Sequence, residues 1–405
     1  MWKPPDAIAQ RFPLVARPRP ACPPLAERVQ ETSDLVHSAE HDGKLASAAA
    51  AQNMAALIAS DCGMPELARS LCWRHTEVYL RAQPLGAQEA RYALEPLVNL
   101  ARLLIRGGDG DGAYQLLDTL NQAVRSRAEA VIDGRAVSFR NLTSSDDAHR
   151  QVCQWLWTVL LGDGTRALVA AGQWDRVRAH AKQHRGVGNR LFDGRQVEVL
   201  ARCLTGEPAS ALEFLKDSTL SEAWERPVAA CLTVFCLATS GEPDMTSVAA
   251  MTKDYLSLDT ARELAVFRSR VGLSVLDLSE STGKPTAAEV SDRIINEAAA
   301  CRDGYVAREV LAHPGCCERM SSAERHALSA AVSSAQLGQG HMPEKLLHDL
   351  MSAVAVSAVA TERCLATESR RKSNHLEGLC DETGAVAREP RADYVSGRDA
   401  SAPLR

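Results

Sequence analysis

A run of glycines and aspartates in the stretch LLIRGGDGDGAYQLLD, residues 103–118, has the composition of an ion-binding or phosphate-binding loop. A calcium loop needs oxygen ligands at alternate positions, glycine at the sixth and glutamate at the twelfth. Counted from Asp109, the sixth residue is Tyr114 and the twelfth is Leu120, so a calcium loop is excluded. A dinucleotide site needs a strand before its glycines, whereas an amphipathic helix pattern precedes these. The stretch is therefore predicted to be a tight turn between two helices.

The segment RVRAHAKQHRGVGNR, from Arg176 to Arg190, is a second candidate because it is rich in cations. His180 and His184 are four residues apart and share one helix face, a spacing that can bind zinc. No glutamate follows His180 as a zinc protease requires, and no third ligand is near, so no metal site is predicted. Two interpretations stay open: a docking site for an acidic partner segment, or an ordinary solvated helix face. The candidate docking residues are Arg176, Arg178, His180, Lys182, His184 and Arg185.

A third candidate is the stretch HPGCCERM, which places His313 near Cys316 and Cys317. A cysteine nucleophile needs a base and an electropositive pocket, and the spacing alone does not bring an imidazole to a thiol. The chain also has no Walker loop, no GxSxG elbow and no HExxH pair. We therefore assign no catalytic residue and expect no cofactor.

The composition indicates that helices position these residues. Only 4% of the 405 residues are aromatic, while Ala and Leu, which favour helices, are abundant. The formal net charge of -5 argues against a protein that binds nucleic acid through bulk positive charge.

A recurring signal has a glycine that ends one helix and a small residue five positions later in the next. Glycine ends a helix because it adopts positive φ readily, and the small residue lets the two helices approach closely. The segments are GMPELA from Gly63, GDGDGA from Gly108, GQWDRV from Gly172, GEPASA from Gly206 and GKPTAA from Gly283, with weaker versions from Gly241 and Gly340. Apolar stripes at i, i+3, i+4 and i+7 flank the turn at Gly108, so the sequence predicts repeated antiparallel helix pairs.

These turns resemble those of tetratricopeptide repeats, in which Gly-Asp-Tyr-x-x-Ala has the same spacing. The resemblance covers roughly residues 35 to 360 and is degenerate. Two intervals, Gly172 to Gly206 and Gly206 to Gly241, are 34 and 35 residues by subtraction, near the family's period; the others are longer. The whole chain is also similar to actinobacterial helical-repeat proteins with no assigned activity. The resemblance implies an all-α, TPR-like α-solenoid.

In the family, the first helix of each repeat lines a concave groove that holds an extended peptide. Counting back from the turn glycines places a set of polar residues on these helices. The resemblance implies that their Asn side chains would pair with peptide amides and their Arg side chains with carboxylates; the alternative is a solvated helix face. The residues are Asn53, Glu95, Asn99, Arg102, Arg106, Asp163 and Arg166.

The stretch AVIDGRAVSF, Ala130 to Phe139, interrupts the helical pattern. Asp133-Gly134 between two runs of β-forming residues predicts a two-residue hairpin, with the next helix capped at Ser144 or Ser145. The Asp133-Gly134-Arg135 insertion is either part of a binding face or a tolerated surface loop.

Three regions follow from these patterns: a Pro-rich extended segment over 1–25, the helical-repeat domain over 26–365, and a disordered tail over 366–405. The N-terminus has no apolar core of signal-peptide length. The apolar stretch from Pro227 to Ala238 is too short to span a bilayer. The 12 Cys form no framework of close pairs. A cytoplasmic protein that does not bind membranes is expected.

An α-solenoid offers a long curved surface that suits peptides better than small substrates. We therefore expect a non-catalytic adaptor that binds a peptide segment or partner protein. One version presents a peptide substrate, with an acidic leader, to modifying enzymes in ribosomal-peptide natural-product biosynthesis. The alternative is a regulatory sensor that binds a signalling peptide or metabolite and acts through a partner; an enzyme with a site between helices is favoured least.

Overall fold

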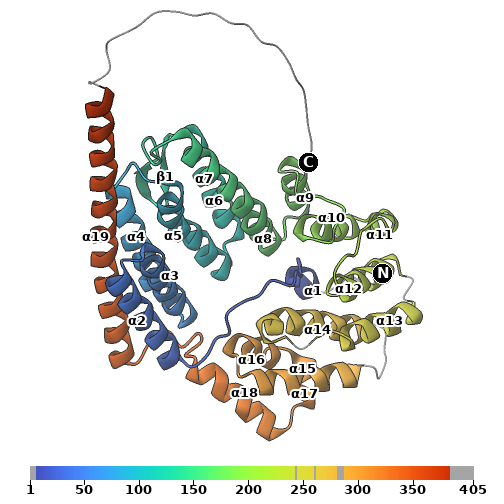
Figure 1. The fold of residues 1–405 in the computed structure, drawn as a ribbon. Coiled ribbons are helices and arrows are strands. Elements are labelled where there is room, and N and C mark those ends of the chain that lie inside the picture. Colours follow the sequence, from blue (N-terminus) through green and yellow to red (C-terminus); the bar gives the residue numbers. More distant parts are fainter. Residues whose placement is uncertain (1–5, 242–243, 260, 281–286, 384–405) are drawn as a thin grey trace, which may run out of the picture.

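The computed structural model is an all-α fold with one small β-hairpin, and it describes residues 6–241, 244–259, 261–280 and 287–383 (Figure 1). The predicted fold class, antiparallel helix pairs with a hairpin insertion, is confirmed. The first half of the chain contains α1 Asp6–Arg11, α2 Leu25–Asp42, α3 Leu45–Asp61, α4 Pro65–Arg81, α5 Ala87–Arg106, α6 Gly110–Ser126, β1 Glu129–Ile132, β2 Arg135–Ser138, α7 Asp146–Val159, a π-helical turn Leu160–Gly164, α8 Thr165–Ala170 and α9 Trp174–Gln183. The second half contains α10 Asp193–Leu204, α11 Pro208–Lys216, α12 Glu225–Ser240, α13 Met245–Leu256, a 3-10 turn Arg262–Leu264, α14 Ala265–Glu280, α15 Ala287–Cys301, α16 Gly304–Leu311, α17 Pro314–Arg319, α18 Ser322–Ser334 and α19 Glu344–Thr383.

Consecutive helix pairs stand side by side and form two limbs, one from α2 to α9 and the other from α10 to α18 (Figure 1). Each limb has its own apolar core, and a smaller cluster that contains Val177 and Val197 joins them where α9 packs on α10. Within the limbs the first helices of successive pairs pack on one another: α3 on α5 and α5 on α7, then α10 on α12, α12 on α14 and α14 on α16. We call the side of the molecule formed by these first helices, with α8, the inner face.

The glycine turns form as the sequence predicts. Gly108 has a φ of 85° between α5 and α6, and the Asp109 side chain caps α6 by accepting the amide of Gly112. The stretch that resembles an ion-binding loop is therefore a helix–helix turn. Gly63, Gly172, Gly206 and Gly241 also have positive φ, whereas Gly283 lies outside the described residues. Ala113, the small residue after the Gly108 turn, is fully buried, and the small residues Ala68, Val177 and Ala211 of the other turns are fully buried as well.

The hairpin forms at the predicted position. Strands β1 and β2 pair antiparallel with Ile132 opposite Arg135, and Asp133 and Gly134 both have positive φ, as a type I′ turn requires. The Asp133 carboxylate accepts a hydrogen bond from the Trp73 indole at 2.9 Å, which fixes the turn against α4. Ser145 caps α7, one of the two positions expected.

The two ends of the helical array meet at Asp61, the last residue of α3. Its buried carboxylate accepts from Arg28 of α2 at 2.6 Å and from the Tyr305 hydroxyl of α16. The Asp61 carbonyl also accepts the Gly338 amide at 2.7 Å, after α18. From there the chain enters α19, which packs on α2, α3 and α4. The array is therefore closed on itself (Figure 1).

The N-terminal segment, residues 6–24, runs along the inner face between the limbs (Figure 1). It contains the short helix α1, which packs on α14, and continues without regular structure to α2. Ile8, Phe12 and Leu14 are buried in the core of the second limb. The segment expected to be a separate extended region therefore completes the packing of the inner face.

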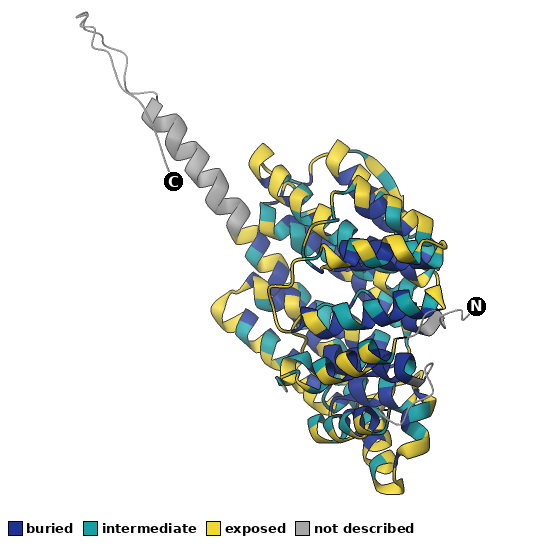
Figure 2. Cartoon of the chain, turned by 90° about the vertical axis from the view of Figure 1, so that its right-hand side faces the viewer, coloured by how far each residue is buried: buried dark blue, intermediate teal, exposed yellow. Residues whose placement is uncertain are grey.

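Helix α19 continues to Thr383, so the region expected as a tail from 366 begins as helix, and residues 384–405 lie outside the described residues. In the described part of the chain, the window Glu344–Thr367 is the one long and apolar enough to cross a membrane, by length and composition only. It is longer than the apolar stretch noted in the sequence. Its buried residues, including Leu350 and Val354, face the core of the first limb. Across the described residues, the buried side chains lie where helices pack against one another (Figure 2).

Candidate partner-binding face

The polar residues expected on the first helices form one hydrogen-bonded row across the inner face of the first limb. Asn53 of α3 donates to Glu95 of α5 at 2.9 Å and accepts from Asn99 at 3.3 Å. Arg102, one turn further along α5, donates to Asn99 at 2.9 Å. These residues come together because both helices present the same polar edge at i, i+3 and i+4 spacing.

The row continues through Asp163, which lies in the π-helical turn between α7 and α8. Its buried carboxylate accepts from Arg102 at 2.7 Å and from Arg166 at 3.2 Å. A π-helical turn inserts one extra residue into a helix, and here that turn carries Asp163 toward α5. One carboxylate therefore neutralises part of the charge of two arginines.

Arg106 ends the row at the closure of the array. It donates to Asp61 at 3.1 Å and also to the Ser60 hydroxyl. The side chains of Arg102 and Arg106 remain 50% and 46% exposed, so both can still bind a partner. The structure thus links six of the seven residues taken from the repeat resemblance, while Arg106, one turn beyond Arg102 on α5, bonds to Ser60 and Asp61 instead. We call the seven residues the inner stripe: Asn53, Glu95, Asn99, Arg102, Arg106, Asp163 and Arg166.

The inner face of the second limb holds the N-terminal segment through its backbone. The Gln196 side chain of α10 accepts the Leu14 amide at 2.7 Å and donates to the Leu14 carbonyl at 2.7 Å. Arg17 forms a bidentate pair with Asp193 of α10, one of its contacts at 3.1 Å, and Arg11 pairs with Asp277 of α14. An extended segment is therefore bound by an amide clamp and two acidic side chains.

Arg19 connects the N-terminal segment with the inner stripe. Its side chain has no ion pair among the described contacts, although its amide donates to the Glu263 carbonyl at 3.0 Å. Desolvation between the limbs lowers the pKa of Arg19, and the nearby cations Arg270 and Arg166 lower it further. Glu309 and Tyr305 oppose this lowering in part. Arg270 is itself paired with Glu309 at 2.6 Å and Arg166 with Asp163 at 3.2 Å.

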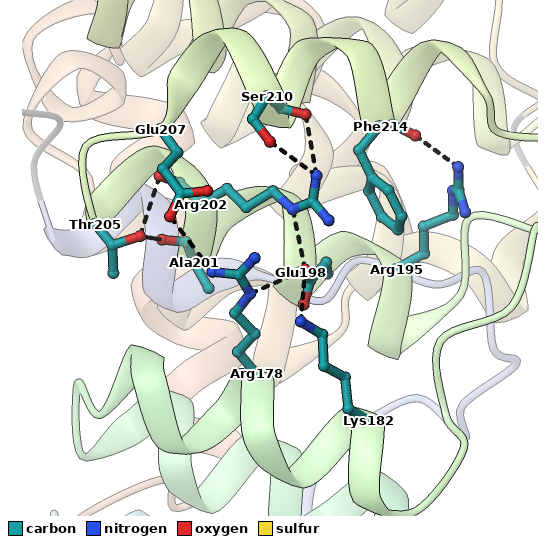
Figure 3. Close-up of polar contacts among 10 residues, drawn as sticks. All are labelled: Arg178, Lys182, Arg195, Glu198, Ala201, Arg202, Thr205, Glu207, Ser210 and Phe214. Atoms are coloured by element: carbon teal, nitrogen blue, oxygen red, sulfur yellow. Dashed lines mark hydrogen bonds and ion pairs between the residues drawn. The ribbon is translucent and has the colours of Figure 1, made fainter.

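The cations of the segment Arg176–Arg190 are largely paired within the chain. Arg178 and Lys182 of α9 and Arg202 of α10 converge on Glu198 at 2.9, 3.4 and 3.0 Å (Figure 3). Glu198 is 1% exposed and lies under them. Arg178 and Lys182 hold α9 against α10, while Arg202 pairs with Glu198 within α10. Much of the charge of α9 therefore serves the junction of the two limbs.

The two histidines of this segment lie differently from its arginines. His180 is buried, with Nδ1 3.2 Å from the Tyr114 hydroxyl and Nε2 3.1 Å from the Leu160 carbonyl. Desolvation, helped by the adjacent His184 ring, lowers the pKa of His180 to about 4. A neutral, buried His180 packs the helix and is unavailable to an acidic partner.

Three cations of the segment remain: Arg190 pairs with Glu222 and Glu225 at 2.6 and 3.1 Å, and the other two are accessible. Arg176 pairs with Asp111 at 2.8 Å, with both side chains about half exposed. Arg185 is exposed at the end of α9, with a φ of 53°. Of the predicted docking residues in this segment, Arg176, Arg185 and the partly exposed His184 are the ones that a partner could reach without breaking the Glu198 cluster. The His184 ring lies 4.6 Å from the His180 ring.

His313 caps a helix and does not activate a thiol. Its Nδ1 lies 3.4 Å from the Cys316 amide nitrogen at the start of α17, and its Nε2 lies 2.9 Å from the Asp277 carboxylate. Burial on its own lowers the pKa of His313, but the hydrogen bond to the Asp277 carboxylate and the interaction with the Cys316 side chain outweigh burial and raise that pKa to about 9. Both ring nitrogens are used, and Cys316 is fully buried.

Other concave regions lie away from the inner face. A surface pocket of about 500 Å³ lies between α2 and α19, lined in part by Val29, Val36 and Leu346, and another of about 600 Å³ lies beside the hairpin at Arg140 and Asn141. Among the described residues no group of three or more His, Cys, Asp or Glu is placed to hold a metal ion.

Several residues of the inner face were not anticipated from the sequence. Gln196 and Asp193 lie outside the motifs noted in the sequence, and Asp277 carries no motif. One sequence pattern could have indicated that the N-terminal segment is bound. The large apolar residues Phe12 and Leu14 stand on either side of Pro13, the spacing at which side chains of an extended chain share one side. The role of Asp61 could not be predicted from the sequence, because its partners lie on α2, α5 and α16, helices that no local pattern brings together.

Comparison with known proteins finds no family model, no curated protein and no solved structure that matches this chain. The function must therefore be argued from the inner face itself.

Proposed function

We propose that this protein is a non-catalytic adaptor that binds an extended segment of a partner chain on its inner face. The observation that carries the proposal is the amide clamp of Gln196 on Leu14, because it shows how this face holds extended backbone. Peptide-binding helical repeats use Asn and Gln side chains in this way. The TPR-like turn segments support the same proposal.

The inner stripe is the surface proposed for the partner. It offers amide groups at Asn53 and Asn99 and half-exposed guanidinium groups at Arg102 and Arg106. Amides suit a peptide backbone, and guanidinium groups suit carboxylates. The unpaired Arg19 adds positive charge beside the stripe, so the partner segment is proposed to be acidic.

A narrower version of the proposal follows from this chemistry. An acidic leader peptide, presented to a modifying enzyme of natural-product biosynthesis, has the charge and extended form that the inner stripe suits. The free thiols of the described cysteines are compatible with the cytoplasmic location proposed for such an adaptor.

The test is capture of partners from the native host, with the purified full chain as bait and mass spectrometry as the readout. A variant with Asn99→Ala, Arg102→Ala and Arg106→Ala is compared with a control variant of equal composition, Asn141→Ala, Arg140→Ala and Arg150→Ala, whose residues are all exposed and lie outside the stripe. Thermal melts establish that both variants fold. A partner lost with the stripe variant and kept with the control supports the proposal; a partner kept by both contradicts it.

A further inference from the structure

The N-terminal segment is bound as a ligand is bound. Between α1 and α2 it forms no helix or sheet, and its main-chain groups at Leu14 are satisfied by one side chain, Gln196. Phe12 and Leu14 are each 2% exposed and pack into the second limb. Val15 and Ala16, which follow Leu14 and precede Arg17, are only partly buried. Alternate anchoring of this kind is the pattern of an extended peptide on a receptor surface.

The charges of the segment and of the second limb are complementary. Arg17 pairs with Asp193 at the start of α10, and Arg11 pairs with Asp277 of α14. The Asp277 carboxylate also accepts from His313 at 2.9 Å, which holds it in place. Two acidic positions therefore flank the two apolar ones, matching the order Arg, Phe, Pro, Leu, x, x, Arg over residues 11–17.

We infer that residues 11–17 are an internal ligand, and that the inner face of α10 and α14 binds the same residue pattern in a partner. That pattern is an extended segment with a basic residue, an aromatic residue, proline and an apolar residue in succession. A second basic residue follows three positions after the apolar one. This inference rests on the proposed function, because it assigns the partner chemistry of the second limb. The partner displaces residues 11–17 from Gln196, Asp193 and Asp277. The inner stripe of the first limb takes the acidic segment, so the two limbs recognise opposite charges.

The connection to α2 makes such exchange possible. Residues 18–21 are exposed, and the prolines at 18, 20, 23 and 24 keep the connection to α2 extended. The Cys22 carbonyl accepts the Gly304 amide at 2.9 Å and fixes the far end of the connection. A short tether holds the internal ligand at a high effective concentration, so a free peptide competes poorly until the tether is cut.

The experiment uses the full chain with a recognition sequence for a specific protease inserted after Arg19, in the exposed stretch. The probe is a fluorescent synthetic peptide of residues 6–19, and its anisotropy is measured with the uncut and the cut protein. Cutting removes the tether, so the probe should bind the cut protein about tenfold or more tightly than the uncut one. Gln196→Ala in the cut protein should abolish this binding.

A charge exchange keeps the test specific. The probe with Arg17→Glu should bind the cut wild-type protein weakly and regain affinity for the cut Asp193→Arg protein. The inference would be overturned if the cut segment co-eluted with the rest of the protein and the probe peptide did not bind. The segment would then be a permanent part of the core. A cut or uncut protein that dimerises by exchanging these segments would also overturn it, because the occupant would be a second copy. A negative result with the probe peptide leaves the partner-capture result for the inner stripe unchanged. A negative capture result likewise leaves the probe-binding result unchanged. Failure of this inference can therefore be distinguished from failure of the proposed function.

Discussion

The Gln196 side chain satisfies both main-chain groups of Leu14, at 2.7 Å each, across 182 positions of sequence. Its Nε2 also donates to the Leu191 carbonyl at 2.8 Å. One buried amide thus ties the N-terminal segment to the first turn of α10 and fixes the course of the chain along the inner face.

Replacing Gln196 with Ala should loosen this segment. The change removes three hydrogen bonds and leaves the Leu14 amide, the Leu14 carbonyl and the Leu191 carbonyl without this partner. The unfolding free energy should therefore fall by about 2 kcal/mol. Trypsin cleavage after Arg11, which precedes Phe12, should become faster. The matched control is Gln30→Ala, at an exposed position whose side chain bonds only to Asp34. Equal cleavage rates in both variants would contradict the role of the clamp.

Asp61→Asn should weaken the closure of the array. Arg28, 4% exposed, would lose its carboxylate partner, and such a loss costs about 3–5 kcal/mol. Arg106 and Tyr305 would lose the same acceptor charge. The unfolding free energy in denaturant and the radius from X-ray scattering measure the effect. Asp42→Asn, which breaks an exposed pair with Lys44, should change neither, and a comparable fall in both variants would argue against a special role for Asp61.

The pH dependence of stability should carry the signature of His313. Its pKa is about 9 in the folded chain, above the value of about 6.5 for an unperturbed histidine. The folded state therefore holds this proton more tightly, and the resulting stability is complete below about pH 6.5 and lost as pH rises through about 9. The slope should reach at most about 1.4 kcal/mol per pH unit.

His313→Gln should remove that slope. Chemical denaturation at several pH values measures it, and the comparison is between slopes, since the variant also alters the cap of α17. An unchanged slope in His313→Gln would place the titrating group elsewhere. Asp277, Arg11 and Cys316 are the groups that contact or face this ring.

Cys203 and Cys236 should resist alkylation in the folded protein. Their sulfurs lie 3.2 Å apart on α10 and α12, both buried. The hydrogen bond to Cys236 and burial raise the pKa of Cys203 above its ordinary value, so the thiolate needed for attack is scarce. Iodoacetamide labelling read by peptide mass spectrometry should modify the partly exposed cysteines before Cys203 and Cys236: Cys153, Cys301, Cys317 and Cys364. Early labelling of Cys203 would show that α10 and α12 separate readily.

Local signals predicted local structure well. The positive φ of Gly108, the cap at Asp109, the hairpin turn at Asp133-Gly134 and the cap at Ser145 each depend on a few adjacent residues. The inner stripe was also found from spacing, because repeated turns fix the phase of the first helices. Whether the stripe binds a partner stays a prediction.

Long-range contacts gave no such signal. His180 resembled a surface docking residue because its neighbours are cationic, yet Tyr114 and Leu160 enclose it. Glu198 sits within an ordinary amphipathic helix, and only the approach of α9 reveals why it is buried beneath cations. The Pro-rich N-terminus has the composition of a solvated extension. It is held because Gln196, which is distant in sequence, accepts the Leu14 amide. Such positions depend on how the array curves, which single-helix patterns do not encode.

The closure at Asp61 changes how the array should come apart. A linear stack of repeats touches only its nearest neighbours, so it can fray from either end and lose its units one after another. In this chain the pairs at both ends share one buried carboxylate, and α19 covers the opening pair. Neither end is free to unravel first. Unfolding should therefore be concerted, with the terminal pairs protected from hydrogen exchange as well as the central ones.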